Sequence, residues 1–245
     1  MSRMISRRSA IIGLIGSPAI LVCGQDTDEP IYELTYPPFE AITSPQTFGY
    51  QEASEKDKDK ARAIIQGTPS GPGPIDVAQS FADRFFESDP KAISQWPAPD
   101  SWNPLIVEFF RATGTPNNND MIPWCAAFAN WCLERAGRSG SRSASSQSFL
   151  SKYFERVKEP QAGDLAIFTC YDKSTKASLG VGHVAFFKEK LAGNRIRVVG
   201  GNQSKDGHSS IISYAEFITT GREVRRKISG KYVSCQMRLN TFVRI

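Results

Sequence analysis

Histidine is scarce in this sequence, since the 245 residues include only two, His183 and His208. Five cysteines are present, but they are irregularly spaced and form no C-x-x-C pair. Structural zinc sites and disulfide frameworks usually show regular cysteine spacing, so the pattern argues against both. We therefore expect no metal and no other cofactor, and a search for a catalytic base has few candidates.

Long apolar runs are also missing. The best candidate is N-terminal, where Arg7 and Arg8 precede roughly fifteen mostly apolar residues, too few and too rich in glycine for a membrane span. This is the layout of a secretory signal, and S-R-R-S-A-I-I resembles a twin-arginine signal. We expect residues 1–24 to be a signal peptide and the mature chain to be periplasmic or secreted. Lipid attachment at Cys23 and an uncleaved tail are the alternatives, and Val22 is a poor match to lipoprotein processing.

The sequence also lacks a strong excess of positive charge. The net charge is +5, and it falls to +2 once Arg3, Arg7 and Arg8 leave with the signal segment. No basic stripe interleaved with aromatic residues is present, so nucleic acid is not an expected partner. A modest attraction to an acidic polymer stays open.

The remaining length and a hydrophobic content of 40% are enough for a normal core in one or two domains. Residues 25–75 contain the polar run Q-E-A-S-E-K-D-K-D-K and end in G-T-P-S-G-P-G-P. This composition predicts a flexible linker, with a short helix near residues 56–65. The folded domain is then expected over residues 76–245.

The first part of this domain has helical patterns. Apolar residues at helical spacing follow Asp76, which predicts a short amphipathic helix with Asp76 as its N-cap. A second helix is predicted from Asn103 as cap and Pro104 as first residue. A third is predicted from about Pro123 to Ala136.

The second part changes to short runs rich in β-branched and aromatic residues: D-L-A-I-F-T-C, G-H-V-A-F-F-K, R-I-R-V-V-G-G and C-Q-M-R-L-N-T-F-V-R-I. Helices followed by strands indicate an α+β fold, with N-terminal helices packed on an antiparallel β-sheet. A disulfide between Cys170 and Cys235 and two free thiols fit their predicted strands equally well, and Cys132 is expected in the core.

Cys125 lies at the start of the third predicted helix. Exposed amides and the macrodipole at a helix N-terminus favour a thiolate, which is the nucleophilic form of cysteine. His183 follows in G-V-G-H-V-A-F-F, at the beginning of a predicted strand where a substrate could reach it. Cys125 is thus a candidate nucleophile and His183 a candidate base.

A hairpin of residues 183–188 and 195–200 suggests a third residue. A register that pairs 188 with 195 places His183 across from 200, and Asn202 becomes a diagonal neighbour on the same face. Asn202 can then orient the imidazole, as in a Cys-His-Asn triad. Gln203 would face the other way and is the weaker candidate.

Each of these residues also has a structural explanation. Free cysteines are commonly buried, a histidine at a strand start is usually structural, and G-G-N-Q is typical of a turn. Their combination favours catalysis, because nucleophile, base and orienting residue occur in an order and geometry that fit one site.

Four motifs follow one another along the chain: W-C-A-A-F-A-N-W-C-L, P-Q-A-G-D-L-A-I-F, G-H-V-A-F-F and V-V-G-G-N-Q. Together they resemble the papain-like cell-wall hydrolases of the NlpC-type and CHAP superfamily, especially a bacterial and phage subfamily with P-W-C-A-A-F and G-G-N-Q. The resemblance implies a minimal papain-like fold that cleaves amide bonds of peptidoglycan. By position it assigns Cys125 as nucleophile, His183 as base and then acid, and Asn202 as the orienting residue.

Three residues near the helix start are candidates for substrate binding. Trp124 is expected to flank the cleft, and Asp120 and Asn119 are expected either to line it or to cap the helix. The basic segment G-R-E-V-R-R-K-I-S-G-K-Y is interpreted as a solvated hairpin, with contact to an anionic glycan as the alternative.

These expectations describe an exported cysteine peptidase or amidase whose partner is peptidoglycan. One alternative is a binding module of the same fold that grips peptidoglycan or a protein without cleaving it. Another is a secreted antibacterial toxin with the same chemistry, for which an inhibitor or immunity protein is an expected partner.

Overall fold

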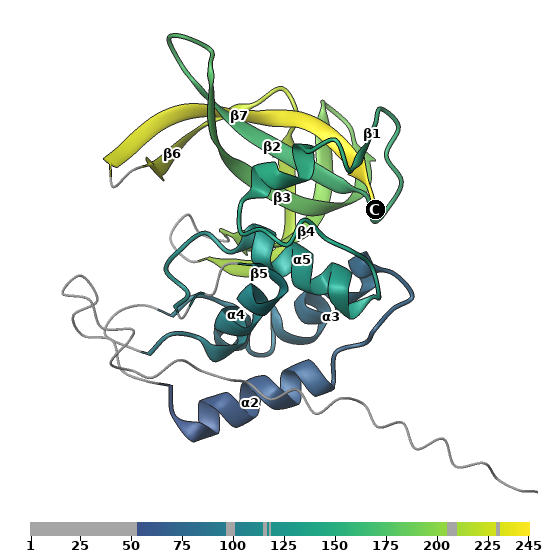
Figure 1. The fold of residues 1–245 in the computed structure, drawn as a ribbon, viewed down its shortest axis with the longest axis vertical. Helices are drawn as coiled ribbons and strands as arrows, with labels where there is room; N and C mark the ends of the chain where they lie inside the picture. The colour runs from purple at the N-terminus through teal and green to yellow at the C-terminus, as the bar shows by residue number, and fades with distance from the viewer. Residues whose placement is uncertain (1–52, 97–100, 115–116, 118, 205–209, 229–230) are drawn as a thin grey trace, which may run out of the picture. The chain divides into compact units, whose positions relative to one another are not determined.

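The computed structural model describes residues 53–96, 101–114, 117, 119–204, 210–228 and 231–245. Helices come first and strands follow, and the strands form one antiparallel sheet (Figure 1). The predicted α+β class is therefore confirmed. The predicted signal peptide and His208 lie outside the described residues. Within the described ranges, no helix combines the length and the apolar character needed to cross a bilayer.

The helical elements are α2 (Glu55–Gln66), α3 (Pro74–Phe85), η2 (Pro90–Ile93), α4 (Pro104–Phe109), η3 (Phe110–Ala112), α5 (Cys125–Arg135) and η4 (Ser146–Leu150). Asn103 caps α4 as predicted, since its Oδ1 accepts a 3.0 Å hydrogen bond from the Leu105 amide. The start of α3 differs from the prediction. Gly73 is the N-cap, and Asp76 reaches back to accept a 2.9 Å hydrogen bond from the Gly73 amide.

Helix α2 lies inside the segment predicted as a linker. Its position matches the short helix expected near residues 56–65, but its apolar side chains are buried and it packs on α4. Ile65 is fully buried, so this part of the segment belongs to the folded domain. Burial of an amphipathic face stabilises such a short helix more than its intrinsic propensity does.

The strands are β1 (Glu155–Val157), β2 (Leu165–Asp172), β3 (Ser178–Leu191), β4 (Arg195–Gln203), β5 (Ile211–Ile218), β6 (Arg222–Ile228) and β7 (Lys231–Arg244). They are ordered β1-β7-β2-β3-β4-β5, and β6 pairs with β7. The predicted hairpin of β3 and β4 is present. Strands β1 and β5 were not predicted, whereas β6 and the part of β7 that pairs with it match the hairpin predicted for the basic segment.

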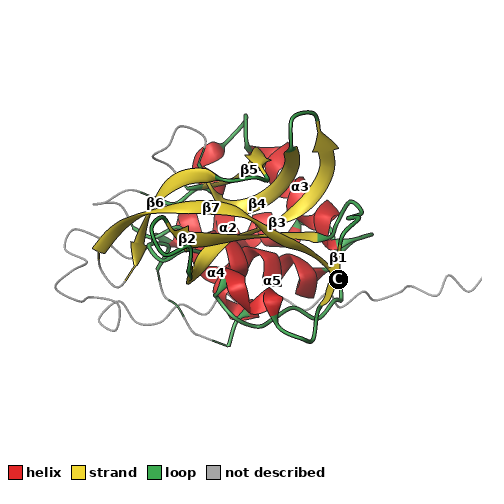
Figure 2. Cartoon of the chain, turned by 90° about the horizontal axis from the view of Figure 1, so that it is seen from above, coloured by secondary structure: helices red, strands yellow, loops and turns green. Residues whose placement is uncertain are grey.

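Helix α5 lies against the sheet, in contact with β3 and β4, and α3 contacts β5 (Figure 1). Seen from above, the strands pass over the helices (Figure 2). Residues Cys125 to Leu133 of α5 are all buried, which explains why the helix is apolar around its whole circumference. It is the central helix of the domain.

Two apolar clusters lie on opposite faces of the sheet, because side chains alternate along each strand. We call the first the helix-side core, which contains the helices together with Ile167, Val184 and Phe186. We call the second the inner core, which contains Phe168 and Ala185. Neighbouring residues of β2 and β3 therefore point into different cores.

The sheet curls around the inner core. Phe217 of β5 stacks on Phe168 of β2 with ring centroids 4.6 Å apart, although two other strands separate β5 from β2 in the sheet order. A flat sheet would keep these rings far apart, since adjacent strands are spaced by about 4.8 Å. The inner face is therefore concave.

Candidate functional site

Cys125 is the first residue of α5, as predicted, and Trp124 is the N-cap without a side-chain capping bond. The Cys125 sulfur lies close to three donors: the backbone N–H of Val184, the backbone N–H of Ala126 and the side chain of Asn202. These donors favour the thiolate. The thiol is only 3% exposed, however, and burial outweighs them, so the pKa of Cys125 is raised. The resting residue is a neutral thiol.

His183 lies on β3 and points into the inner core. Its ring stacks on Phe217 with centroids 5.5 Å apart and an angle of 20° between the planes. Burial, together with the charges of Arg226 and Arg222, lowers the pKa of His183 to about 3. Its Nε2 is buried and makes no hydrogen bond among the described residues. The imidazole is thus neutral and keeps an unused nitrogen.

The structure brings Cys125 to Val184, in the middle of β3, but into no hydrogen bond with the imidazole in the described part of the chain. Because β3 begins at Ser178, His183 lies inside the strand and not at its start, where it was predicted. The sulfur contacts the backbone of Val184, whose side chain belongs to the helix-side core, whereas His183 faces the inner core. No hydrogen bond joins Cys125 to His183 in the described part of the chain. The separation follows from strand alternation, which sends the side chains of 183 and 184 to opposite faces.

Asn202 lies beside Cys125. It has a left-handed backbone, with φ of 58°, and its Oδ1 accepts a hydrogen bond from the Ser210 hydroxyl. Its side chain is hydrogen-bonded toward the sulfur of Cys125 and not, in this structure, to His183. Asn202 therefore contacts the predicted nucleophile, while the expected role was to orient the base.

The register of β3 and β4 differs from the predicted one. Leu191 pairs with Arg195, and an irregularity between Phe187 and Glu189 shifts the pairing, so that Phe186 lies opposite Val199. The loop is therefore shorter than assumed, and the bulge adds one residue to β3. Continuing this register would put His183 across from Asn202 itself.

Gln203, the weaker candidate in the sequence, also lies near this region. Its side chain is buried, and neither its Oε1 nor its Nε2 has a hydrogen-bond partner among the described residues. A Cβ on Gly200 would lie 2.8 Å from the Gln203 Nε2 and 2.8 Å from the Ala185 Cβ, which belongs to the inner core. The left-handed Asn202 thus turns Gln203 back toward the inner face, where an ideal strand would not place it.

Glycines allow the close approach of these elements. A Cβ on Gly201 would lie 2.3 Å from Cζ3 of Trp124, and one on Gly182 would lie 1.9 Å from the carbonyl oxygen of Phe168. No other residue fits at either position without a shift of the backbone or the ring. The G-G-N and G-V-G-H patterns therefore reflect packing around the start of α5 and β3.

The three predicted substrate-binding residues have structural contacts. Trp124 is fully buried and stacks on Phe109 at 6.2 Å, so it does not line an open cleft. Asp120 accepts hydrogen bonds from the backbone amides of Trp96 (2.9 Å) and Asn103 (3.0 Å). Burial raises its pKa to about 6. Its carboxylate fastens the N-terminal helical segment to the domain.

Asn119, the third of these residues, accepts a 2.9 Å hydrogen bond from the Met121 amide through its Oδ1. This contact shapes the loop before α5 and does not cap the helix, whose N-cap is Trp124.

Arg226 of β6 is a site residue that the sequence did not reveal. Its charge acts on both Cys125 and His183. Its Nε is buried without a partner, and its terminal nitrogen contacts the Met237 sulfur at 3.5 Å. The segment was recognised as basic, but its composition could not show that one arginine turns toward the site.

The other cysteines among the described residues are free thiols. Cys132 is in the helix-side core, as predicted, and Cys170 and Cys235 are unbridged in the inner core. Burial, together with the neighbouring Cys170 thiol, raises the pKa of Cys235 to about 12. Among the residues that the structure describes, no three His, Cys, Asp or Glu side chains gather in a way that could hold a metal ion.

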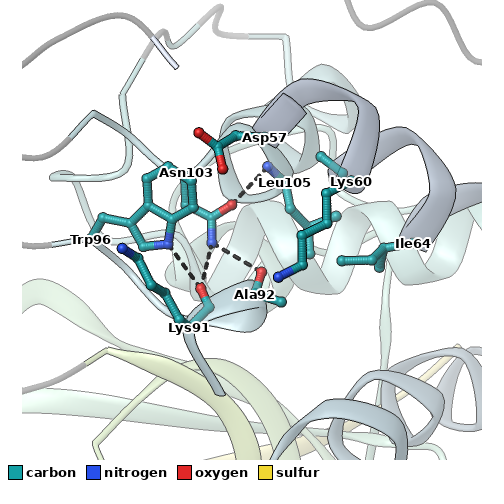
Figure 3. A pocket seen from close by; sticks show the side chains of 9 residues that line it. Asp57, Lys60, Ile64, Lys91, Ala92, Trp96, Asn103 and Leu105 are labelled. Atoms are coloured by element: carbon teal, nitrogen blue, oxygen red, sulfur yellow. Dashed lines mark hydrogen bonds between the residues drawn. The ribbon is translucent and has the colours of Figure 1, made fainter. Parts of the chain in front are cut away.

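A separate cavity of about 130 Å³ lies among α2, η2 and α4, lined in part by Lys60, Trp96 and Asn103 (Figure 3). The Asn103 side chain donates hydrogen bonds to the backbone carbonyls of Ala92 (3.0 Å) and Ser94 (2.8 Å). Cys125 does not line this cavity. The polar contacts around the cavity hold the N-terminal helical segment together.

Comparison with known families identifies the region that carries the site. Residues 117–202 match the CHAP domain. This CHAP region covers about a third of the chain and includes Cys125, His183 and Asn202, at whose position it ends. No curated protein and no solved structure matches the chain.

Proposed function

We propose that the chain is an exported cysteine hydrolase that cleaves amide bonds of peptidoglycan, within the stem peptide or between sugar and peptide. The match of residues 117–202 to the CHAP domain supports hydrolysis of peptidoglycan. The position of Cys125 is the observation that supports this residue as the nucleophile. Its sulfur lies at a helix N-terminus, among the Val184 amide, the Ala126 amide and the Asn202 side chain.

The proposed reaction is acyl transfer. The Cys125 proton passes to neutral His183 as the sulfur attacks the amide carbonyl carbon. His183 then returns the proton to the nitrogen of the leaving amine while the C–N bond breaks and a thioester forms. Water adds to the thioester, releases the carboxylic acid and restores the thiol. The pKa of His183, about 3, keeps the resting imidazole unprotonated but makes it a weak base, so the transfer requires this pKa to rise when substrate or water enters the site.

The oxyanion needs two donors. The backbone N–H of Cys125, at the start of α5, is the expected first donor. The Val184 amide and the Asn202 side chain both lie beside the sulfur and are the candidates for the second. Asn202 in this role differs from the orienting role that the resemblance implies.

The proposed proton transfer requires a closer approach of Cys125 and His183 than the structure contains. The sulfur lies against the backbone of Val184, the imidazole faces the inner core, and the His183 Nε2 has no partner among the described residues. Either a rotation of the imidazole or a bridging water supplies the connection. The unpaired nitrogen is consistent with this, because a buried polar atom without a partner is costly in a resting core.

One observation favours the alternative of a non-catalytic binding module. Cys125 and His183 are each 3% exposed, and burial raises the pKa of the thiol. A domain that only binds peptidoglycan has no need for an exposed thiolate.

Digestion of purified peptidoglycan sacculi by the full chain separates the two functions. We expect the wild type to release new amines and carboxyls and Cys125→Ala to release none, with thermal unfolding near that of the wild type. Cys132→Ala is the matched control, because it removes a thiol from the same helix and should keep activity. Mass spectrometry of the fragments identifies the bond that breaks. No digestion by either protein would exclude the hydrolase, and equal digestion by the wild type and Cys125→Ala would exclude Cys125 as its nucleophile.

A further inference from the structure

The inner face of β6 carries two arginines. Arg222, Val224 and Arg226 are every second residue of β6 and therefore lie on the same face. Val224 packs against the inner core, so this is the inner face of the strand, and Arg226 lies opposite Val233 in the pairing with β7. Arg225 lies on the other face, with its guanidinium 5.3 Å from the Tyr232 ring centroid. The strand therefore places two of its positive charges toward His183 and one away from it.

No carboxylate among the described residues neutralises the charge of Arg226. No ion pair in that part of the chain includes Arg222 or Arg226, whereas Arg197 and Arg244 are paired with carboxylates. Arg226 is half-buried, its Nε is buried without a described partner, and among the described residues the Met237 thioether sulfur is the hydrogen-bond acceptor of its terminal nitrogen. A guanidinium that is partly removed from water without an anion is costly, and proteins rarely keep one without a use.

The neighbours of Arg226 make the imbalance larger. Arg222 is close enough for the two charges to repel, and its guanidinium lies 5.0 Å from the centroid of Phe217, the ring that stacks on His183. The uncharged amide of Gln203 is also buried without a partner in this structure. Among the described residues, the region around Cys125 and His183 thus holds unused donors and positive charge but no carboxylate.

We propose that Arg226, supported by Arg222, forms a carboxylate-binding subsite beside Cys125, and that the substrate carries a free carboxylate close to the scissile amide. The inference rests on the proposed hydrolase function and adds the charge of its substrate. A guanidinium binds a carboxylate through two parallel N–H···O bonds, and Arg226 has both a free Nε and terminal nitrogens for this. Stem peptides of peptidoglycan carry free carboxylates. The subsite therefore selects the amide bond whose neighbouring carboxylate is in position to bind Arg226.

The first test measures the charge at Cys125 without requiring turnover. The full chain is alkylated with iodoacetate, an anion, and with iodoacetamide, its neutral analogue, and the rate at Cys125 is followed by mass spectrometry of the peptide that contains it. The ratio of the two rates cancels the fraction of thiolate, because both reagents attack the same thiolate. It reports whether an anion is attracted to the site.

We expect Arg226→Gln to lower the iodoacetate-to-iodoacetamide ratio by about fivefold. The ratio for Arg226→Lys should lie between those of the wild type and Arg226→Gln, since lysine keeps the charge and loses the planar guanidinium. Arg225→Gln is the matched control, because it removes the same charge from the adjacent residue on the opposite face, and it should leave the ratio within about twofold. Equal ratios in Arg226→Gln and Arg225→Gln would overturn the proposal. So would a Cys125 that reacts with neither reagent, since a closed site cannot admit a carboxylate.

The second test compares two substrates, a disaccharide-peptide with a free carboxylate next to the scissile amide and the same compound with that carboxylate amidated. We expect Arg226→Gln to lose about tenfold or more in kcat/KM on the acid and less than about twofold on the amide. An equal loss on both would mean that Arg226 acts only on the thiolate, and the subsite would be rejected. If the wild type cleaves neither compound, the hydrolase proposal fails, and the alkylation ratio still decides whether the subsite exists.

Discussion

Gly201 offers a sharp test of how the start of α5 is held, because an alanine there has no room. Its Cβ would lie 2.3 Å from Cζ3 and 2.7 Å from Cε3 of Trp124, and 2.9 Å from the Phe128 Cβ. Carbon atoms in contact are separated by about 3.5–4.0 Å, so the indole would have to move by about 1 Å or more. The Trp124 ring is fully buried and packed against Phe109 and Phe128, so no free space is available for this movement.

We therefore expect Gly201→Ala to lower the free energy of unfolding by about 3 kcal/mol, the upper end for overpacked cores. For a domain of this size, that corresponds to a fall in Tm of about 6–12 °C. Activity should fall further than stability alone explains, because Trp124 directly precedes Cys125 and a displaced ring moves the nucleophile. Urea unfolding and a sacculus digestion assay at a temperature where both proteins are folded measure the two effects.

A double-mutant cycle isolates the clash. In a Trp124→Leu background the ring atoms are gone, so Gly201→Ala should cost at least about 1 kcal/mol less than it does in the wild type. Gly114→Ala is the control, because its Cβ would lie 3.5 Å from the nearest atom, an ordinary contact. If Gly201→Ala changes stability by less than about 0.5 kcal/mol, or costs the same in both backgrounds, the close packing of Gly201 on Trp124 is refuted.

Two further predictions concern ionisation. The pKa of the Cys125 thiol is raised by burial, so its rate of alkylation by iodoacetamide should climb about tenfold per pH unit between pH 6 and 8; a plateau below pH 6 would instead indicate a thiolate–imidazolium pair at rest. Burial raises the pKa of Glu108 from 4.5 to about 7, so the folded state binds the carboxyl proton more tightly than the unfolded state does. The contribution of Glu108 to stability is therefore greatest below pH 4.5 and is lost as the pH rises to 7. Glu108→Gln should therefore be more stable than the wild type at pH 8, by about 2–3 kcal/mol, and show little gain at pH 4.5, as measured by urea unfolding at both values; an equal effect at the two pH values would contradict the shift.

The success of prediction along this chain depends on how local the signal is. The cap at Asn103, the start of α5 at Cys125 and the strand runs of β2, β3 and β4 are each specified by neighbouring residues, and the structure contains them. The register of β3 and β4 was predicted less well, because a bulge between Phe187 and Glu189 is decided by packing on both faces. The burial of Trp124 depends on Gly201, which is far along the chain, and no local pattern indicates it.

The sequence by itself determined that Cys125 begins a helix, that His183 lies on a following strand and that Asn202 ends the next one, because helix caps, glycines and β-branched runs act over a few residues. Only the tertiary structure decided that Cys125 approaches the backbone of Val184 while His183 faces the inner core, and that the charge of Arg226 acts on both. These arrangements depend on the curl of the sheet and on the pairing of β6 with β7. Such contacts between distant segments follow from burial and hydrogen bonding in the whole domain, which no single stretch of sequence contains.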